Sequence, residues 1–358
     1  MSTMRRAIGL MSGTSLDGVD VAIITTDGRR VAEPGPALTV PYSPALRARL
    51  RGVLGGVGPV AEVEREITEI HADAVARFVE EHGVAAAVIG FHGHTILHRP
   101  AERRTWQIGD GALLARRTGI DVVCDFRSAD VAGGGEGAPL VPLFHAALAA
   151  RLDKPLAIVN IGGVANVTWL GAEEGAILAF DTGPGNAPID DWALRHIGRP
   201  VDRDGALARA GRIDSARLAA FLAHPFFDRP PPKSLDRDDF AVFDDDGLGA
   251  ADGAATLTAM TAAAIARAQT HFPAPVARWL VTGGGRHNPA LMDELARRLA
   301  VPVAPVEAAG WDGDALEAQA FAYLAVRSLE GLPLSLPSTT GVTRPMTGGR
   351  LFRAHDER

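Results

Sequence analysis

The chain has 358 residues, 47% of them hydrophobic, which is typical of one large or two medium folded domains. Its formal net charge is −7 and no basic run stands out, so we expect no nucleic-acid partner. We also expect no signal peptide or membrane span, because the sequence lacks apolar runs of the kinds these require. The one cysteine, Cys124, excludes an internal disulfide and fits a cytoplasmic location.

Lysine is nearly absent, since arginine supplies all positive side chains except Lys154 and Lys233. Neither lysine follows a glycine, which excludes a phosphate-binding loop ending in Gly-Lys-Ser/Thr. The strand lysine of protein kinases is missing as well. If the chain binds ATP, it therefore uses another scaffold.

The opening stretch, residues 8–24, predicts a strand, a tight turn and a second strand. Gly13 and Gly18 permit unusual backbone conformations and close approach of main-chain N–H groups to a ligand. The turn also carries hydroxyl and carboxylate groups: Ser12, Thr14, Ser15, Asp17 and Asp20. This composition suits a phosphate with its metal ion, and an ordinary hairpin turn is the alternative.

Two helices are expected next, over residues 44–57 and 59–82, followed by a buried strand over 85–90. This strand leads into His92, His94 and Thr95, at the end of a strand where α/β proteins gather their ligands. Contact of these side chains with a sugar or phosphate competes with a metal site. A metal site needs further ligands that the neighbouring sequence does not offer.

A helix near 110–118 and a strand over 121–124 precede Asp125 and Arg127. Arg127 is suited to clamp a carboxylate or phosphate with two hydrogen bonds. An internal ion pair between Asp125 and Arg127 is the alternative. The glycine-rich residues 133–137 predict a flexible loop.

Residues 155–182 repeat the opening pattern of strand, glycine-rich turn and strand, which predicts two similar α/β domains facing each other over a cleft. Asp181 ends the last strand of this repeat, which makes it a candidate general base, with capping of the turn as the alternative. The Gly-Pro-Gly loop after it and the helix over 188–197 predict bare backbone amides that favour an anion.

The long loop over 224–240 is expected to be functional because of its length. A helix over 252–271 and a strand over 277–281 lead to Gly283, Gly284 and Gly285, against which a flat ring or ribose is able to lie. A last long helix over 314–330 carries Glu317, and the remaining tail is expected to pack over the first half.

Several motifs together resemble those of the anhydro-N-acetylmuramic acid kinase family. The resemblance runs in order along nearly the whole chain and rests on segments 9–20, 92–95, 125–127, 137–140, 160–166, 180–186, 231–234, 283–288 and 317–322. The segments 9–20 and 180–186 are the most specific. Phe91 and His94 stand where the family usually has serine and glutamine, and residues 235–237 stand where it has Thr-Gly-Arg.

The resemblance implies the fold of the sugar kinase, actin and heat-shock ATPase superfamily, which consists of two α/β domains of ribonuclease H-like type. We expect residues 1–140 with about 331–358 to form the first lobe, and 141–330 the second. The implied residues that bind ATP are Gly13, Thr14, Ser15, Leu16, Asp17, Gly18, Val19, Asp20, Gly183, Gly283, Gly284 and Gly285. The implied contacts to the sugar are His92, Thr95, Arg127 and Glu317.

The family reaction opens the 1,6-anhydro ring of the sugar with water and phosphorylates O6 from ATP, which gives N-acetylmuramate 6-phosphate. Asp181 is the implied catalytic base, and Mg²⁺ is expected to be carried mainly by ATP. The resemblance also suggests a homodimer. Two other functions stay open, namely a metal-dependent hydrolase using His92 and His94, and a non-catalytic module that binds ATP or a sugar.

Overall fold

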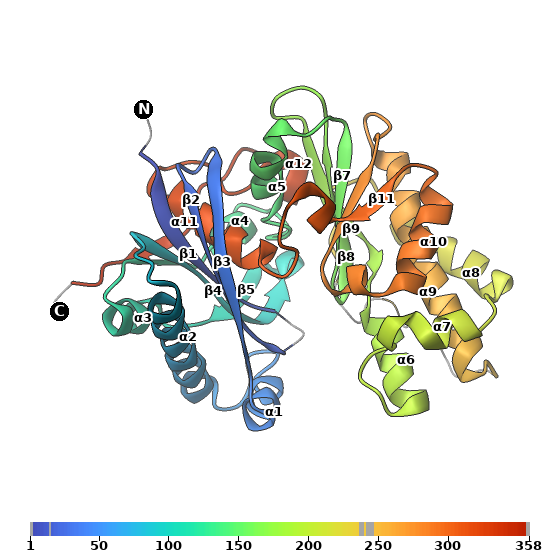
Figure 1. The fold of residues 1–358 in the computed structure, drawn as a ribbon, viewed down its shortest axis with the longest axis horizontal. Coiled ribbons are helices and arrows are strands. Elements are labelled where there is room, and N and C mark those ends of the chain that lie inside the picture. Colours follow the sequence, from blue (N-terminus) through green and yellow to red (C-terminus); the bar gives the residue numbers. More distant parts are fainter. Residues whose placement is uncertain (1–2, 14–15, 236–239, 241–246, 356–358) are drawn as a thin grey trace. The chain divides into compact units, whose positions relative to one another are not determined.

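The computed structural model describes residues 3–13, 16–235, 240 and 247–355, and its contacts divide the chain into two units (Figure 1). Unit 1 comprises Met1–Ala150 and Asp314–Arg358, and unit 2 comprises Arg151–Gly313. Each unit is built on one β-sheet with helices packed against it.

The sheet of unit 1 has the strand order β12-β6-β4-β1-β2-β3, with β5 paired to β4. Strands β1, β2 and β3 form an antiparallel meander, and β4 and β6 run parallel to β1. The strands are β1 (Arg5–Ser12), β2 (Gly18–Thr26), β3 (Val31–Pro41), β4 (Val88–Arg99), β5 (Arg104–Ile108), β6 (Val122–Cys124) and β12 (Arg350–Phe352).

The long helix α2 and the short helix α3 cover the hydrophobic core of unit 1, where Phe78 of α2 and Leu114 of α3 pack with Phe91 of β4. Helix α2 ends at Gly83, whose φ of 59° suits glycine. The helices are α1 (Pro44–Gly52), α2 (Val60–His82), α3 (Gly111–Thr118), α4 (Ser128–Ala132), α5 (Pro142–Leu148), α11 (Leu316–Leu329) and α12 (Pro337–Thr340), with the 3-10 turns η1 (Pro100–Glu102) and η2 (Ala149–Arg151).

Helix α11 lies directly on β1 and β4 because both strands carry glycine at the crossing. A Cβ atom at Gly9 would lie 1.7 Å from the carbonyl oxygen of Ala318, and one at Gly90 would lie 2.0 Å from that of Phe321. The sequence-based boundaries assigned α11 and residues 141–150 to the second lobe. The contacts instead place both in unit 1: the two glycines admit the backbone of α11, and α5 packs against α11.

The sheet of unit 2 has the order β11-β10-β7-β8-β9. Its strands are β7 (Leu156–Ile161), β8 (Val164–Leu170), β9 (Ile177–Pro184), β10 (Trp279–Thr282) and β11 (Val303–Pro305). Its helices are α6 (Ala187–Ile197), α7 (Ala206–Ala210), α8 (Ser215–Leu222), α9 (Ala250–Arg267) and α10 (Pro289–Leu299), with the 3-10 turns η3 (Arg203–Gly205), η4 (Pro225–Asp228), η5 (Ala268–His271), η6 (Gly284–His287) and η7 (Val306–Ala309). The core between this sheet and helices α9 and α10 contains Trp279, Phe180 and Leu295.

The two sheets share one topology. In unit 2, β7, β8 and β9 form an antiparallel meander, and β10 and β11 continue the sheet in parallel on the side of β7. This arrangement repeats that of β1, β2, β3, β4 and β6 in unit 1. The duplication predicted from two glycine-rich hairpins is therefore confirmed, and the chain has the expected fold class of two similar α/β domains.

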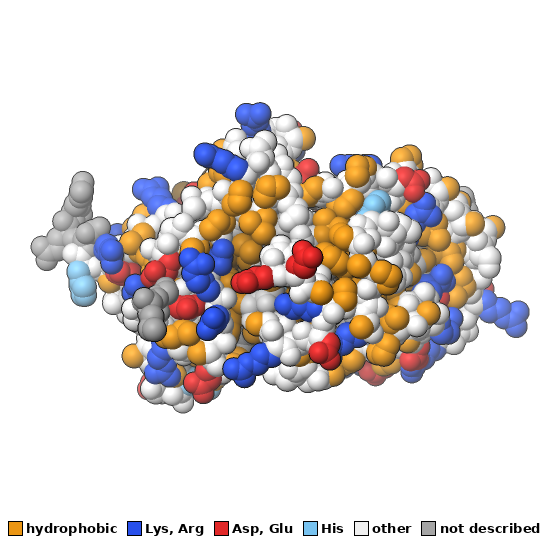
Figure 2. Space-filling model, turned by 90° about the horizontal axis from the view of Figure 1, so that it is seen from above, with side chains coloured by type: hydrophobic (Ala, Val, Ile, Leu, Met, Phe, Trp, Pro, Cys, Tyr) orange, Lys and Arg blue, Asp and Glu red, His pale blue; other side chains and the backbone are white. Residues whose placement is uncertain are grey.

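Figure 2 shows charged side chains of both signs on one face of the molecule. On the face in Figure 2, basic and acidic side chains are interspersed rather than gathered by sign. Within the described ranges, no helix combines the length and the apolar character needed to cross a bilayer.

Candidate functional site

The turn between β1 and β2 is held by main-chain contacts. Leu16 has a φ of 60°, and its N–H donates to the carbonyl of Gly13 at 3.1 Å. The carbonyl of Asp17 accepts from the N–H of Tyr42 at 2.9 Å, and Gly18 lies so close to β3 that a Cβ would meet the carbonyl of Val40 at 2.4 Å. Thr14 and Ser15, which the sequence also predicts to bind ATP, lie outside the described residues.

Asp20 and Val19 follow the turn on β2, where Val19 is fully buried and Asp20 is half-buried. The Thr39 hydroxyl donates to Asp20 Oδ1 at 2.7 Å. Burial raises the pKa of Asp20 to about 6; the hydrogen bond from Thr39 opposes the rise, and the carboxylate of Glu317 adds to it. A cation near Asp20 would relieve this unfavourable environment.

Ser12, at the end of β1, belongs to a buried polar chain. The hydroxyl of Tyr42 donates to Ser12 Oγ at 2.8 Å, and Ser12 Oγ lies 3.0 Å from His94 Nδ1. Burial lowers the pKa of His94 to about 4, so this imidazole is neutral near pH 7. Ser12 is thus tied to the residue after β3 and to β4, and these contacts fix the end of the strand that enters the turn.

His92 and Arg127 form the centre of the predicted sugar side. Arg127 Nε and a terminal nitrogen lie 3.2 and 3.0 Å from His92 Nε2, and its other terminal nitrogen donates to the carbonyl of Gly137 at 2.7 Å. Nε2 therefore accepts, and Nδ1 carries the hydrogen that it donates to the carbonyl of Gly93 at 2.9 Å. Burial and the adjacent guanidinium both hold the pKa of His92 well below its usual range.

This arrangement decides two alternatives. Among the described residues, Arg127 forms no ion pair with Asp125, whose Oδ1 instead accepts from the N–H of Ser128. A metal on His92 is disfavoured, since both ring nitrogens are engaged and a guanidinium faces one of them. The described part of the chain also contains no group of three or more His, Cys, Asp or Glu side chains able to hold a metal.

Glu317, in the first turn of α11, connects the two predicted regions of unit 1 electrostatically. The charge of Glu317 raises the pKa of Asp20. Burial lowers the pKa of the Arg127 guanidinium to about 10, and the charge of Glu317 opposes this decrease. The hydroxyl of Thr95 accepts from Gln107 at 3.2 Å. The charge of Glu317 thus couples the carboxyl of Asp20 to the sugar-side candidate Arg127.

A cavity of about 360 Å³ lies beside the β4–β5 hairpin. Its lining includes His92, Trp106, Asp110 and Cys124, whereas Thr95, Arg127 and Glu317 do not line it. Only one of the four side chains predicted to contact the sugar lines this cavity, so we do not identify the cavity with the sugar site.

Asp181 lies inside β9 rather than at its end. The strand continues to Pro184 because β8 begins at Val164 and pairs with it, and Asp181 itself pairs with Asn166. The N–H of Asp181 donates to the carbonyl of Lys233 at 2.9 Å, and Oδ2 accepts from the N–H of Leu235 at 2.9 Å. The Asp181 side chain is thereby held in one orientation. It is also buried, with only 8% of its surface exposed.

The loop after Asp181 differs from the prediction. The N–H groups of Gly185, Asn186 and Ala187 donate to the carbonyls of Gly162 and Gly163, so they are not bare amides awaiting an anion. Gly183 lies within β9, where a Cβ would approach that of Ala264 on α9 to 2.8 Å. The difference arises because the loop after Asp181 packs against the turn at Gly162–Gly163, which is distant in the sequence.

The three glycines after β10 have separate roles. A Cβ at Gly283 would lie 2.3 Å from the side-chain oxygen of Asn160, and one at Gly285 would lie 2.5 Å from Ile161. Packing against β7 therefore requires both residues to be glycine. Gly284 is exposed, with its nearest neighbour at 3.4 Å, and is the position that is open to a ligand.

Sequence reasoning missed three residues that hold the predicted ones. Thr39 and Tyr42 support Asp20 and Ser12 from β3 and the turn after it, and Lys233 supports Asp181. Of these three residues, only Lys233 is unusual in the sequence, because the chain has just two lysines.

Comparison with known proteins gives a consistent result. Residues 5–354 match the family profile described as "Anhydro-N-acetylmuramic acid kinase". Proteins with this name are 64% identical over 350 residues in Paramagnetospirillum magneticum, 59% over 353 in Rhodospirillum rubrum and 60% over 357 in Acidiphilium cryptum. These alignments cover 96%, 97% and 97% of this chain, and 98%, 94% and 98% of the three relatives.

Proposed function

Because the chain belongs to the anhydro-N-acetylmuramic acid kinase family, we propose that Asp181 is the base with which it activates water against its sugar substrate. The chain is a sugar kinase that uses ATP to convert anhydro-N-acetylmuramic acid into N-acetylmuramate 6-phosphate, a step of peptidoglycan recycling. The observation that supports the role of Asp181 is its carboxylate, buried in β9 and oriented by the N–H of Leu235. No observation favours a metal-dependent hydrolase or a non-catalytic module.

In the proposed reaction, the Asp181 carboxylate takes a proton from water while the water oxygen bonds to the anomeric carbon. The bond between this carbon and O6 breaks, and its electron pair goes to O6. O6 then bonds to the γ-phosphorus, and ADP leaves. The negative charge of Asp181 also stabilises the positive charge that grows on the anomeric carbon.

We assign the phosphate contacts to Gly13–Asp20 and the nucleoside contacts to the turn at Gly283–Gly285, within which Gly284 is the exposed position. Support for the first assignment comes from the hydrogen bond between Leu16 and Gly13 and from the acidic side chains of Asp17 and Asp20. Mg²⁺ would neutralise charge on the ATP phosphates when bound. Asp20 fits it, since its carboxylate is a hard oxygen donor whose ionised form burial disfavours.

We assign the sugar contacts to His92, Thr95, Arg127 and Glu317. The neutral His92 is held in one tautomer with both ring nitrogens engaged, and its Nε2 in turn fixes the orientation of the Arg127 guanidinium. The Arg127 guanidinium, engaged with Gly137 as well, supplies the positive charge that the carboxylate of the sugar's lactyl group requires.

The test is turnover with defined substrates. The purified chain, with Mg²⁺ and γ-labelled ATP, is expected to phosphorylate anhydro-N-acetylmuramic acid and not other amino sugars. Asp181→Asn is expected to fold and bind ATP but to lose turnover by several orders of magnitude. Near-normal phosphorylation by this variant would remove Asp181 from the mechanism.

We further propose a cytoplasmic homodimer, with no nucleic-acid or membrane partner. An ATP-consuming enzyme acts where ATP is present, and the acidic net charge disfavours binding to nucleic acid. Support for a second copy comes from the exposed apolar side chains of Leu194, Ile197 and Val201, which are 56%, 39% and 43% exposed. Light scattering of the purified chain tests the dimer.

A further inference from the structure

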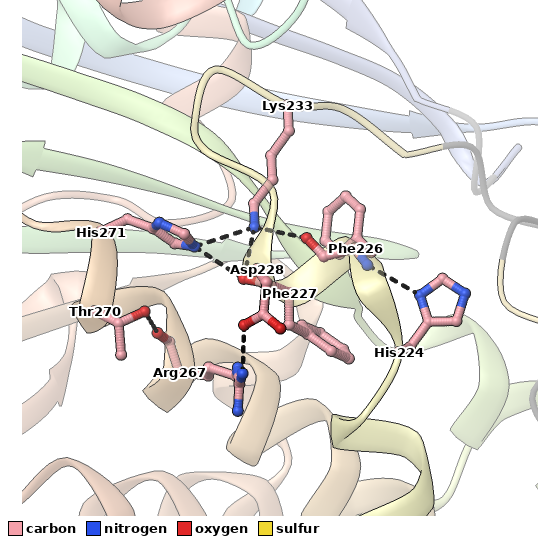
Figure 3. A network of polar contacts seen from close by, with 8 residues as sticks. All are labelled: His224, Phe226, Phe227, Asp228, Lys233, Arg267, Thr270 and His271. Carbon is pink, nitrogen blue, oxygen red and sulfur yellow. Dashed lines mark hydrogen bonds and ion pairs between the residues drawn. The ribbon is translucent and has the colours of Figure 1, made fainter.

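Lys233 is a buried lysine in a chain that has only one other. Its side chain is 3% exposed, and Nζ donates to the carbonyls of Phe226 and Phe227 in the turn η4, at 2.9 and 3.2 Å (Figure 3). Nζ also lies 4.6 Å from the centre of the Phe226 ring, within the range of a cation–π interaction. Burial of an ammonium group is costly, so this placement calls for a reason.

The charged neighbours do not explain the burial. Asp228 is bonded to Arg267, and His271 Nε2 lies 2.9 Å from the carbonyl of Phe227 and 3.3 Å from Lys233 Nζ. Because a carbonyl only accepts, Nε2 carries a hydrogen there and does not accept from Lys233. Burial, together with the charges of Arg229 and Arg267, lowers the pKa of Lys233 to about 8. The ammonium thus binds chiefly to the backbone of η4.

The backbone of the same segment holds Asp181. Strand β9 is the edge of its sheet, so its outer N–H groups need partners from outside the sheet. Lys233 supplies its carbonyl to the N–H of Asp181, and Leu235, two residues on, supplies its N–H to the Asp181 carboxylate. One short segment therefore fixes both the main chain and the side chain of Asp181.

We infer that Lys233 is a positioning residue: its ammonium anchors residues 233–235 to η4 so that the N–H of Leu235 orients the carboxylate of Asp181. The inference rests on the proposed role of Asp181. A methionine or leucine would fill the same space without donors. The carbonyls of Phe226 and Phe227 would keep the N–H of Arg229 and His271 Nε2 as donors, but the side chain of residue 233 would lose its hydrogen bonds to η4. The segment would be free to shift along β9, and a displacement of about 1 Å in such a supporting element costs about 100-fold in rate.

The first test compares Lys233→Met with Lys154→Met, which removes the other lysine. For Lys233→Met we expect kcat to fall about 100-fold, with the KM for ATP within about twofold of the wild type. Lys154→Met is expected to keep both constants. A Lys233→Met enzyme that retains kcat within about threefold, or that loses ATP affinity in proportion, would overturn the inference.

The second test does not alter the lysine and serves also if Lys233→Met fails to fold. Leu235→Pro removes the N–H that donates to Asp181, whereas Leu235→Ala shortens the same side chain and keeps the N–H. We expect kcat of the proline variant to lie at least about tenfold below that of the alanine variant. Equal kcat values for the two would contradict the inference.

One double variant and the single variants together separate this inference from the proposed function. If Lys233 acts through Asp181, adding Lys233→Met to Asp181→Asn lowers kcat no further. If Asp181→Asn keeps its turnover, the proposed function fails and the inference fails with it. If Asp181→Asn is inactive while Lys233→Met and Leu235→Pro both turn over normally, only the inference fails.

Discussion

Asp20→Asn is expected to stabilise the protein while lowering its activity. The carboxyl of Asp20 has an ordinary pKa of 3.8, and burial raises it to about 6 in the folded chain. The folded state therefore holds this proton more tightly than the unfolded state, and its stability falls as pH rises from about 4 to above 6. Since each tenfold change in an equilibrium constant is worth 1.36 kcal/mol, ionised Asp20 costs at most about 3 kcal/mol at pH 7.5.

The asparagine keeps the acceptor for Thr39 and carries no charge, so it escapes this cost. Thermal or denaturant unfolding of both proteins at pH 4 and pH 7.5, without nucleotide, measures the difference. We expect little difference at pH 4 and a gain of up to about 3 kcal/mol for the variant at pH 7.5. A difference that does not change with pH, or a variant less stable at pH 7.5, would refute the reasoning.

Asp27→Asn is the matched control. Burial raises the pKa of Asp27, but hydrogen bonds from the N–H groups of Arg30 and Arg29 outweigh burial and lower it below its usual range. Ionised Asp27 therefore contributes stability that is present at neutral pH and is lost as pH falls through its lowered pKa. The same substitution should thus be destabilising at pH 7.5, opposite in sign to Asp20→Asn.

Three further predictions concern unit 1. Gly9→Ala forces a Cβ against the backbone of α11 and should lower the unfolding free energy by about 3 kcal/mol or more. Gly52→Ala is the control and should be neutral, because a Cβ there meets nothing within 4 Å. Equal stabilities of the two variants would contradict the packing argument. Burial raises the pKa of Cys124 to about 12, so its alkylation at pH 8, followed by mass spectrometry, should be about 1,000-fold slower than that of a thiol with the ordinary value of 9.0. Arg127→Lys cannot span His92 and the carbonyl of Gly137 together, so the KM for the sugar should rise at least about tenfold while the KM for ATP stays unchanged.

Local patterns were sufficient to predict the elements that are defined by neighbouring residues. The paired strands of the two hairpins, the helix up to Gly83 and the N-terminus of α10 at Asn288 all follow from glycine, capping and periodicity. The duplicated meander was predicted in the same way, because both copies place a glycine-rich turn between two apolar strands.

Features that depend on distant partners were not predictable. The hydrogen bonds that hold Asp181 come from Lys233 and Leu235, which lie more than 50 residues further along the chain. Phe91, a departure from the family pattern, packs in the core 4.9 Å from the His71 ring, and its neighbour His92 faces Arg127. Nothing local distinguishes an exposed glycine, such as Gly284, from one that packing requires, such as Gly285.

The crossing of α11 over Gly9 and Gly90 also sets an order of events during synthesis. Residues 151–313 leave the ribosome before α11 does, so unit 2 has its whole sequence available while the first sheet has α2 and α3 but still lacks α11. Glu317 arrives with that helix, and its charge acts on the carboxyl of Asp20 and on the guanidinium of Arg127. A nascent or truncated chain that stops short of residue 316 therefore lacks the charge pattern of the completed first unit.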